Sequence, residues 1–275
     1  MRTRFVLDRL GAAALVPVIV LVLAFLVAPF VMTAVLSFDS RTFLAPLPPP
    51  DLSLQWYERF LSDAYLLAGL KTSLTVAVIV TAISTAVGIA TAIMFQRSRF
   101  GGKEGVLSFL LSPLIVPPVV LGFGLLLLLS MLDVGSGLVR LVCGHLIITV
   151  PYAIRASILS VGSVKAVYEE AALSLGATPA EAFRTVTLPL ARSGIIVGAI
   201  FSFVVSMDDV AVAMFLSTPD TFTLPVALMS SMRANFDLSI AAASTLFTVI
   251  VLAGVLVLER TLGLSTLFGN PHGRA

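Results

Sequence analysis

Two adjacent carboxylates interrupt one of the most apolar stretches of the chain. Asp208 and Asp209 follow Ser206, and apolar residues flank them over 203–205 and 210–216. Carboxylates within a membrane span are costly and usually face a bundle interior or a watery cavity. The pattern therefore favours cation-attracting groups along a path through the membrane. The alternative is a shorter span whose outer end leaves both carboxylates in water.

Adjacent positions on a helix point about 100° apart, so both carboxylates cannot face one narrow pore. One of them would line the path, and the other would pair at a subunit seam. His145 and Tyr152 lie in another apolar run and could contact a substrate, although packed, hydrogen-bonded side chains are the commoner outcome. The residues expected along the path are Ser206, Asp208, Asp209 and Tyr152.

Enzyme chemistry finds no support in the sequence. The chain has no Gly-Lys-Ser/Thr phosphate-binding loop, so any ATP hydrolysis must come from another chain. The two histidines, His145 and His272, are far apart and have no metal-ligand spacing. The single cysteine, Cys143, allows no intrachain disulfide. We expect no cofactor or metal to be bound by this chain.

The composition is that of a polytopic helical membrane protein. Of 275 residues, 58% are hydrophobic and only 12% are charged, where a soluble domain would carry about twice that charge. Apolar runs of about twenty residues suffice to cross a hydrocarbon core by helix. The net charge of +2 implies no nucleic-acid partner. The fold class is therefore all-α, in contact with a lipid bilayer.

Six membrane spans can be drawn in a single transmembrane domain over residues 1–275. The first run is too long for a signal peptide and reads as a retained helix. The spans are predicted at about 12–36, 67–95, 106–130, 138–159, 191–216 and 238–258, and a cytoplasmic loop at 160–190.

The distribution of Lys and Arg sets the orientation. With the N-terminus inside, the inner side holds Arg2, Arg4, Arg9, Arg97, Arg99, Lys103, Arg155, Lys165, Arg184, Arg192, Arg260 and Arg274. The outer side holds Arg41, Arg59, Lys71, Arg140 and Arg233. This excess fits the positive-inside rule and predicts two cytoplasmic termini.

The long first outer loop contains a proline-rich stretch and then Trp56, Tyr57 and Phe60 at helical spacing. One interpretation is an amphipathic helix whose aromatic side chains lie at headgroup depth. The other is a docking surface for an outer partner, and the two are compatible.

The cytoplasmic loop has helix signals of its own. Residues 164–175 contain no Gly or Pro, and Gly176 supplies a left-handed helix stop. Thr178 then serves as an N-cap, Pro179 takes the first helical position and Glu181 completes a capping box. That second helix is expected to run until Leu188-Pro189, where proline marks entry into the fifth span. A helix, a sharp turn and a helix are typical of a docking element.

The spacing in this loop resembles a known family. Glu170-Ala171-Ala172, then Gly176, Val186 and Leu188-Pro189, is similar to the EAA loop of bacterial ABC-importer permeases, with Val186 where isoleucine is usual. The resemblance implies the MetI-like permease fold and a coupling helix that sits in a cleft of an ATP-binding subunit. The residues expected to serve ATPase coupling are Glu169, Glu170, Ala171, Ala172, Leu173, Gly176, Leu188 and Pro189.

The same resemblance implies partners and a location. We expect a second permease subunit, usually a paralogue, two ATP-binding subunits that use ATP and Mg, and a periplasmic or extracellular solute-binding protein. The chain would be a transport subunit in the bacterial inner membrane and would form half of the translocation path.

The substrate class follows from a narrower resemblance. The Ser-x-Asp-Asp stretch at 206–209 and the outer Ser-Leu-x-Trp-Tyr at 53–57 resemble permeases of spermidine/putrescine importers, the PotC type. A polyamine would suit carboxylates in the path. Related permeases for phosphonates, opine-like compounds, ferric iron and thiamine stay as alternatives, as does an ion-coupled secondary transporter. A membrane-embedded enzyme is disfavoured.

Overall fold

A computed structural model describes residues 2–43, 46, 48–98, 100–234 and 237–262. Arg99, His272 and Arg274 lie outside the described residues, as do the side chains of Arg2, Arg4 and Arg9. The described chain is helical, with only isolated β-bridges, so the predicted all-α class is confirmed. The elements are α1 (Arg2–Leu36), α2 (Gln55–Ser62), α3 (Ala64–Arg97), α4 (Lys103–Leu111), η1 (Ser112–Leu114), α5 (Pro118–Met131), α6 (Gly137–Ser163), α7 (Ala166–Ser174), α8 (Pro179–Ala182), η2 (Phe183–Thr187), α9 (Leu188–Asp208), α10 (Ala211–Leu216), α11 (Leu224–Ala234) and α12 (Ser239–Leu262).

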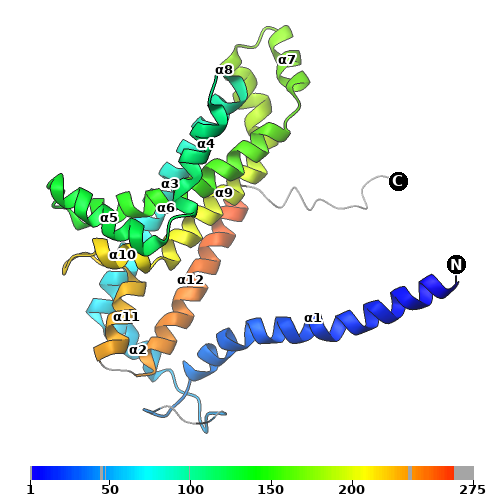
Figure 1. The fold of residues 1–275 in the computed structure, drawn as a ribbon. Coiled ribbons are helices and arrows are strands. Elements are labelled where there is room, and N and C mark those ends of the chain that lie inside the picture. The colour runs from blue at the N-terminus through cyan, green and yellow to red at the C-terminus, as the bar shows by residue number, and fades with distance from the viewer. Residues whose placement is uncertain (1, 44–45, 47, 99, 235–236, 263–275) are drawn as a thin grey trace. The chain divides into compact units, whose positions relative to one another are not determined.

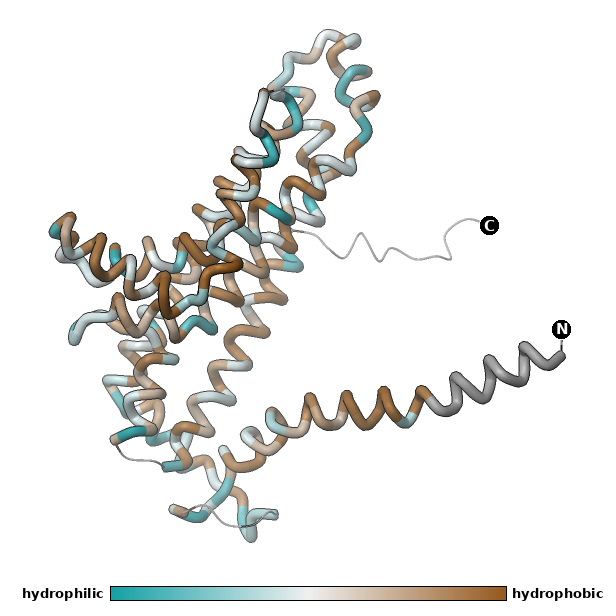
Figure 2. The backbone as a smooth tube through the Cα atoms, viewed as in Figure 1, coloured by the Kyte–Doolittle hydropathy of each residue, from teal (hydrophilic) through white to brown (hydrophobic). Residues whose placement is uncertain are grey.

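Within the described residues, five helical segments are long and apolar enough to cross a membrane, or six if the bent pair α4–η1 and α5 is one span. In Figure 2 these helices are mostly hydrophobic, and hydrophilic colour gathers along α7. The first, second, fourth and sixth predicted spans match α1, α3, α6 and α12 with small shifts of their ends. The prediction that residues 1–275 form a single domain stays a prediction.

The third predicted span is not one straight helix. The chain bends by 98° between residues 103–114 and Pro118–Met131. Pro113, Pro117 and Pro118 explain the bend, because proline lacks an N–H and disfavours helical backbone at the preceding residue. Pro117 accordingly has an extended ψ of 130°. The run predicted as one span over 106–130 is therefore divided between two helices at a sharp bend.

The fifth predicted span is also broken. Helix α9 ends at Asp208, Asp209 takes extended backbone with φ −68° and ψ 125°, and the short α10 begins at Ala211. The apolar helical segment instead runs over Pro179–Asp208. The span predicted over 191–216 is therefore not one continuous helix, because the Asp209 side chain caps a new helix.

One compact unit comprises residues Ala64–Ser230 and Ile250–Ala275. In it, α3, α6 and α9 pack side by side (Figure 1). Small residues allow the close approach: a Cβ at Gly88 would lie 2.7 Å from the carbonyl carbon of Ala153, and one at Gly194 2.4 Å from Ser160 Cβ. Helix α10 packs against α5 and α6 through Val212 and Leu216, which lie in an apolar cluster with Leu129 and Leu141.

The second unit comprises residues Met1–Asp63 and Ser231–Val249. None of the most apolar window of α1 is buried within the chain, so this part of the helix is available to lipid or to other proteins, whereas Leu36 at its end packs near Trp56. Helix α2 is held by Trp56, which packs with Leu238 and Ala242. Arg59 and Asp237 form an ion pair with 3.0 Å between Nη2 and Oδ2.

Candidate coupling and pathway sites

The predicted helix stop in the cytoplasmic loop is confirmed. Gly176 has a φ of +94°, the left-handed region that side chains with a Cβ rarely adopt. The Ala177 N–H donates to Ala172 O at 3.1 Å and the Gly176 N–H to Leu173 O at 3.0 Å. These two bonds form a Schellman motif, which satisfies the last carbonyl groups of α7 and turns the chain sharply.

The predicted capping box is confirmed as well. The Glu181 N–H donates to Thr178 Oγ1 at 3.3 Å, and the Thr178 N–H donates to Glu181 Oε2 at 2.7 Å. Pro179 occupies the first turn of α8, where a missing N–H costs nothing. Local chemistry therefore fixes both sides of the turn between α7 and α8, which we call the elbow (residues 175–178).

The second helix of the loop was expected to end at Leu188-Pro189, but it continues into α9 without a break. Residues Phe183–Thr187 form a π-helical turn, in which the Leu188 N–H donates to Phe183 O, and α9 continues from it. A π-turn beside a proline is physically reasonable, because Pro189 cannot donate the regular helical bond. Leu188 packs against Ala92 and Ala191 in the core, whereas Pro189 is exposed.

Helix α7 presents an exposed surface to the solvent. All nine of its residues are described and none is buried. Leu173 is 43% exposed, and Leu175 at the elbow is 89% exposed. Ala171 is exposed and Ala172 is half-buried, while the Glu170 side chain takes part in no hydrogen bond or ion pair among the described residues. Exposed apolar side chains beside a free carboxylate are suited to a partner protein.

Glu169 lies differently from its neighbour. Its Oε1 accepts from Thr187 Oγ1 at 2.6 Å and from Arg97 Nη2 at 2.7 Å. The Thr187 hydrogen bond, and then the Arg97 guanidinium, lower the pKa of the Glu169 carboxyl despite partial burial. Sequence reasoning placed Glu169 with the coupling residues but missed Arg97 and Thr187. A local sequence pattern cannot predict the contact between Arg97 and Glu169, because the two residues are 72 positions apart.

The break at Asp208-Asp209 separates the two carboxylates by role. Asp209 accepts from the Ala213 N–H at 2.8 Å and from the Val212 N–H at 3.4 Å, so it caps α10. Its side chain is only 8% exposed. Asp208 is exposed, and none of the hydrogen bonds or ion pairs in the described part of the chain uses its carboxylate.

A buried polar seam lies behind this break. His145 is fully buried, and its Nδ1 lies 2.8 Å from Ser206 Oγ. Its Nε2 is 3.8 Å from Asp209 Oδ2 and has no hydrogen-bond partner in the described residues. Thr149 Oγ1 donates to His145 O at 2.7 Å and lies 2.8 Å from Ser84 Oγ, which extends the seam across α3, α6 and α9.

The four residues expected along the path are therefore divided. Ser206 and Asp209 point into the seam, and Asp208 points out of it. Tyr152 is half-buried and stacks on Phe201 with ring centroids 5.9 Å apart. No group of three metal-ligating side chains occurs among the described residues.

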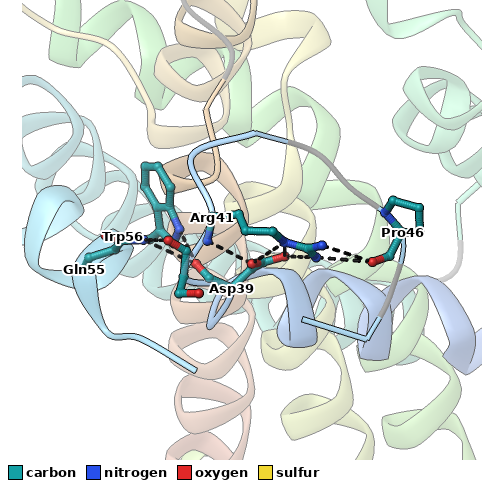
Figure 3. Close-up of polar contacts among 6 residues, drawn as sticks. Asp39, Arg41, Pro46, Gln55 and Trp56 are labelled. Atoms are coloured by element: carbon teal, nitrogen blue, oxygen red, sulfur yellow. Dashed lines mark hydrogen bonds and ion pairs between the residues drawn. The ribbon is translucent and has the colours of Figure 1, made fainter. Parts of the chain in front are cut away.

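The outer loop is organised by internal contacts rather than by the interface. The Trp56 Nε1–H donates to Asp39 O at 2.7 Å, and the Gln55 amide donates to Ser40 O at 2.8 Å (Figure 3). Arg41 Nη2 lies 2.5 Å from Asp39 Oδ2, and this guanidinium lowers the pKa of the Asp39 carboxyl. Trp56 is 3% exposed, so its indole is used inside the fold and not at the surface, while the predicted depth of this helix in the membrane stays a prediction.

The apolar helices and the structured α7–α8 loop fit the membrane subunit of a transporter, and the family match decides the class. Residues 84–264 match the family described as "Binding-protein-dependent transport system inner membrane component". The chain belongs to this family, and it is an inner-membrane, multi-pass permease subunit of a binding-protein-dependent ABC importer, not an enzyme.

Curated relatives cover most of the chain. It is 30% identical over 236 residues to the putrescine transport system permease protein PotI of Escherichia coli, which covers 83% of each chain. It is 29% identical over 236 residues to the spermidine/putrescine permease PotC of Haemophilus influenzae, covering 86% of this chain and 91% of the relative. A probable molybdenum transporter permease of Haloferax volcanii is 27% identical over 211 residues, covering 74% and 77%. The resemblance to ABC-importer permeases is confirmed.

Two solved structures share the fold. A bacterial ABC transporter that imports the acidic polysaccharide alginate matches with a TM-score of 0.73 and 17% identity, over 93% of this chain and 95% of that one. A bacterial alginate ABC transporter in complex with an alginate pentasaccharide-bound periplasmic protein matches with a TM-score of 0.74 and 16% identity, over 94% of this chain and 96% of that one. At these identities the match concerns the fold alone.

Proposed function

We propose that this permease subunit imports a polyamine such as spermidine or putrescine. The observation that carries the proposal is that two relatives are named as permeases for putrescine or for spermidine and putrescine. They are 29–30% identical to this chain over at least 83% of its length. The exposed Asp208 carboxylate at the end of α9 supports it, because a carboxylate beside a span suits a cationic amine. An ion-coupled transporter has no comparable support.

The division of the pathway residues suggests a role for each. Asp208 would contact an amine, whereas Asp209, Ser206 and His145 would hold the break in the helix that presents Asp208. Tyr152, stacked on Phe201, would offer an aromatic face, which attracts cations. The polar seam would thus support the path without lining it.

The other subunits are proposed from the same organisation. A second permease, expected to be a paralogue, would complete the path, and an external solute-binding protein would deliver the substrate. Two ATP-binding subunits that use ATP and Mg would bind the importer's permease subunits, and one would contact the surface formed by Glu170, Leu173 and the elbow. Their closure would move α7 and switch the path between inward and outward access. Both termini would be cytoplasmic.

The test is uptake of radiolabelled putrescine and spermidine by cells that lack this chain and by the same cells complemented with it. We expect complementation to restore ATP-dependent uptake, and excess unlabelled polyamine to compete. Competition by molybdate or thiamine instead, without polyamine uptake, would assign another cargo and overturn the proposal.

A matched pair of variants examines the carboxylates. Asp208→Asn removes a charge-assisted contact worth about 1.5–3 kcal/mol, so uptake at low substrate should fall at least about tenfold. The amount of chain in the membrane should not change. Asp209→Asn is the matched control, because asparagine also caps helices and Asp209 is not proposed to touch the amine. Unchanged uptake in Asp208→Asn would return Asp208 to a solvated outer end of the span.

A further inference from the structure

Arg97, the last residue of α3, contacts three parts of the cytoplasmic loop. Its Nη2 donates to Glu169 Oε1 of α7 at 2.7 Å and to Pro179 O of α8 at 3.3 Å. Its guanidinium carbon also lies 5.6 Å from the centre of the Phe183 ring in η2. A single side chain therefore reaches the first helix of the loop, the second helix and the π-turn.

Glu169 completes the connection from the other side. The same Oε1 that accepts from Arg97 accepts from Thr187 Oγ1 at 2.6 Å, and Thr187 immediately precedes α9. Thr187 is buried, so its hydroxyl is held in place. Arg97, Glu169 and Thr187, which we call the clamp, thus join α7 to the ends of two membrane helices.

Apolar packing does not replace this connection. No residue of α7 is buried. The three clamp residues help to line a cavity of about 120 Å³, together with Gln96, Val164, Lys165 and Phe183. A helix with no fully buried residue, beside a cavity, is positioned mainly by its polar contacts and its two chain connections.

We propose that the clamp transmits movement of α7 to α3 and α9, and that Arg97 and Glu169 are positioning residues for this step. The inference rests on the proposed docking of an ATP-binding subunit at α7. Without the clamp, α7 would move with its ATPase while only its chain connections pulled on the bundle. The two neighbouring glutamates thereby differ: Glu170 faces the partner and Glu169 faces the bundle.

The experiment uses the assembled importer in proteoliposomes and needs no knowledge of the cargo. In a Cys143→Ala background, Leu190→Cys places a thiol on α9, where Leu190 is 54% exposed. Its labelling rate by a membrane-impermeant maleimide is measured with and without ATP and vanadate. We expect a change on nucleotide trapping in the reference protein, and at least a twofold smaller change in Glu169→Gln and in Thr187→Val. ATP hydrolysis and ATPase co-purification should be retained.

The matched control is Glu170→Gln, which should weaken ATPase co-purification instead. Thr187→Ser keeps the hydroxyl and should preserve the labelling change, which separates a positioning role from mere loss of folding. An undiminished labelling change in Glu169→Gln and Thr187→Val, with Glu170→Gln still detaching the ATPase, overturns the clamp and leaves the docking role intact. Failure of the ATPase to co-purify with the reference chain overturns the docking role itself.

Discussion

The molecule contains two pairs of adjacent carboxylates, Glu169-Glu170 on α7 and Asp208-Asp209 at the end of α9. In each pair one side chain bonds inward, Glu169 to Arg97 and Thr187, and Asp209 to the backbone of α10. The other member of each pair is exposed and uses no partner among the described residues. An acidic pair in this chain thus combines a structural anchor with a group available to another molecule.

The two inward-bonding carboxylates, Glu169 and Asp209, are stabilised by different groups. Glu169 is 27% exposed and pairs with a full positive charge. Asp209 is 8% exposed and relies on backbone N–H groups, with a buried imidazole nitrogen 3.8 Å away. Because unpaired polar groups cost more in an apolar interior, the Asp209 region should dominate stability. The Glu169 region should dominate communication with a partner.

The largest effect is expected from a substitution at the turn between α7 and α8. Gly176→Val places a β-branched residue at φ +94°, which costs roughly 1–2 kcal/mol or more and distorts the elbow. We expect ATP-dependent uptake to fall more than about tenfold while the chain stays inserted in the membrane. Gly124→Val is the matched control, since nothing lies within 4 Å of a Cβ there. Normal uptake in Gly176→Val would contradict the coupling assignment.

A second change tests whether the buried seam carries stability. His145→Ala leaves a cavity and takes the imidazole from Ser206, at a cost of roughly 2–4 kcal/mol. The melting temperature of the detergent-solubilised chain, followed by size-exclusion chromatography after heating, should fall by about 5–10 °C. Tyr152→Phe keeps its stacking on Phe201 and should melt like the parent. Equal melting of all three proteins would show that the seam is not a stabilising element.

Replacing Asp208 or Asp209 should have different effects on the melting temperature in the same assay. Asp209→Ala removes the cap of α10, which is worth about 0.5–2 kcal/mol, so the melting temperature should fall by about 2–5 °C. Asp208→Ala should leave the melting temperature unchanged and lower uptake. If Asp208→Ala proved the more destabilising of the two, the assignment of anchor and free group would be reversed.

Features fixed by neighbouring residues could be predicted from the sequence. The stop at Gly176 and the capping box of Thr178 and Glu181 involve residues at most five positions apart, and both are present. The helix breaks were missed although local signals existed. Pro117-Pro118 interrupts the third run, and Asp209 is a good N-cap residue placed two positions before α10.

Long-range contacts could not be predicted in this way. Glu169 is bonded by Arg97, 72 positions away, and by Thr187, 18 positions away, and His145 lies beside Ser206, 61 positions away. Trp56 looked like an interfacial anchor because its type and spacing suit one, yet its indole N–H bonds Asp39 O. Which face of a short helix is buried depends on what packs against it, and a single sequence does not record that.

The smallest expected effect concerns the charge of Glu169. Its partners lower its pKa below the ordinary 4.5, so the carboxylate's contribution is present above pH 4.5 and is lost as the pH falls through the lowered value. A nitroxide at Leu175→Cys, in a Cys143→Ala chain, should show constant mobility from pH 7 to pH 5 and higher mobility only below pH 4.5. Because an exposed ion pair contributes about 1 kcal/mol or less, the change should be modest. Glu169→Gln should be mobile already at pH 7 and lack this transition, whereas Glu170→Gln should retain it. A transition that survives in Glu169→Gln would mean that another group ties α7 to the bundle.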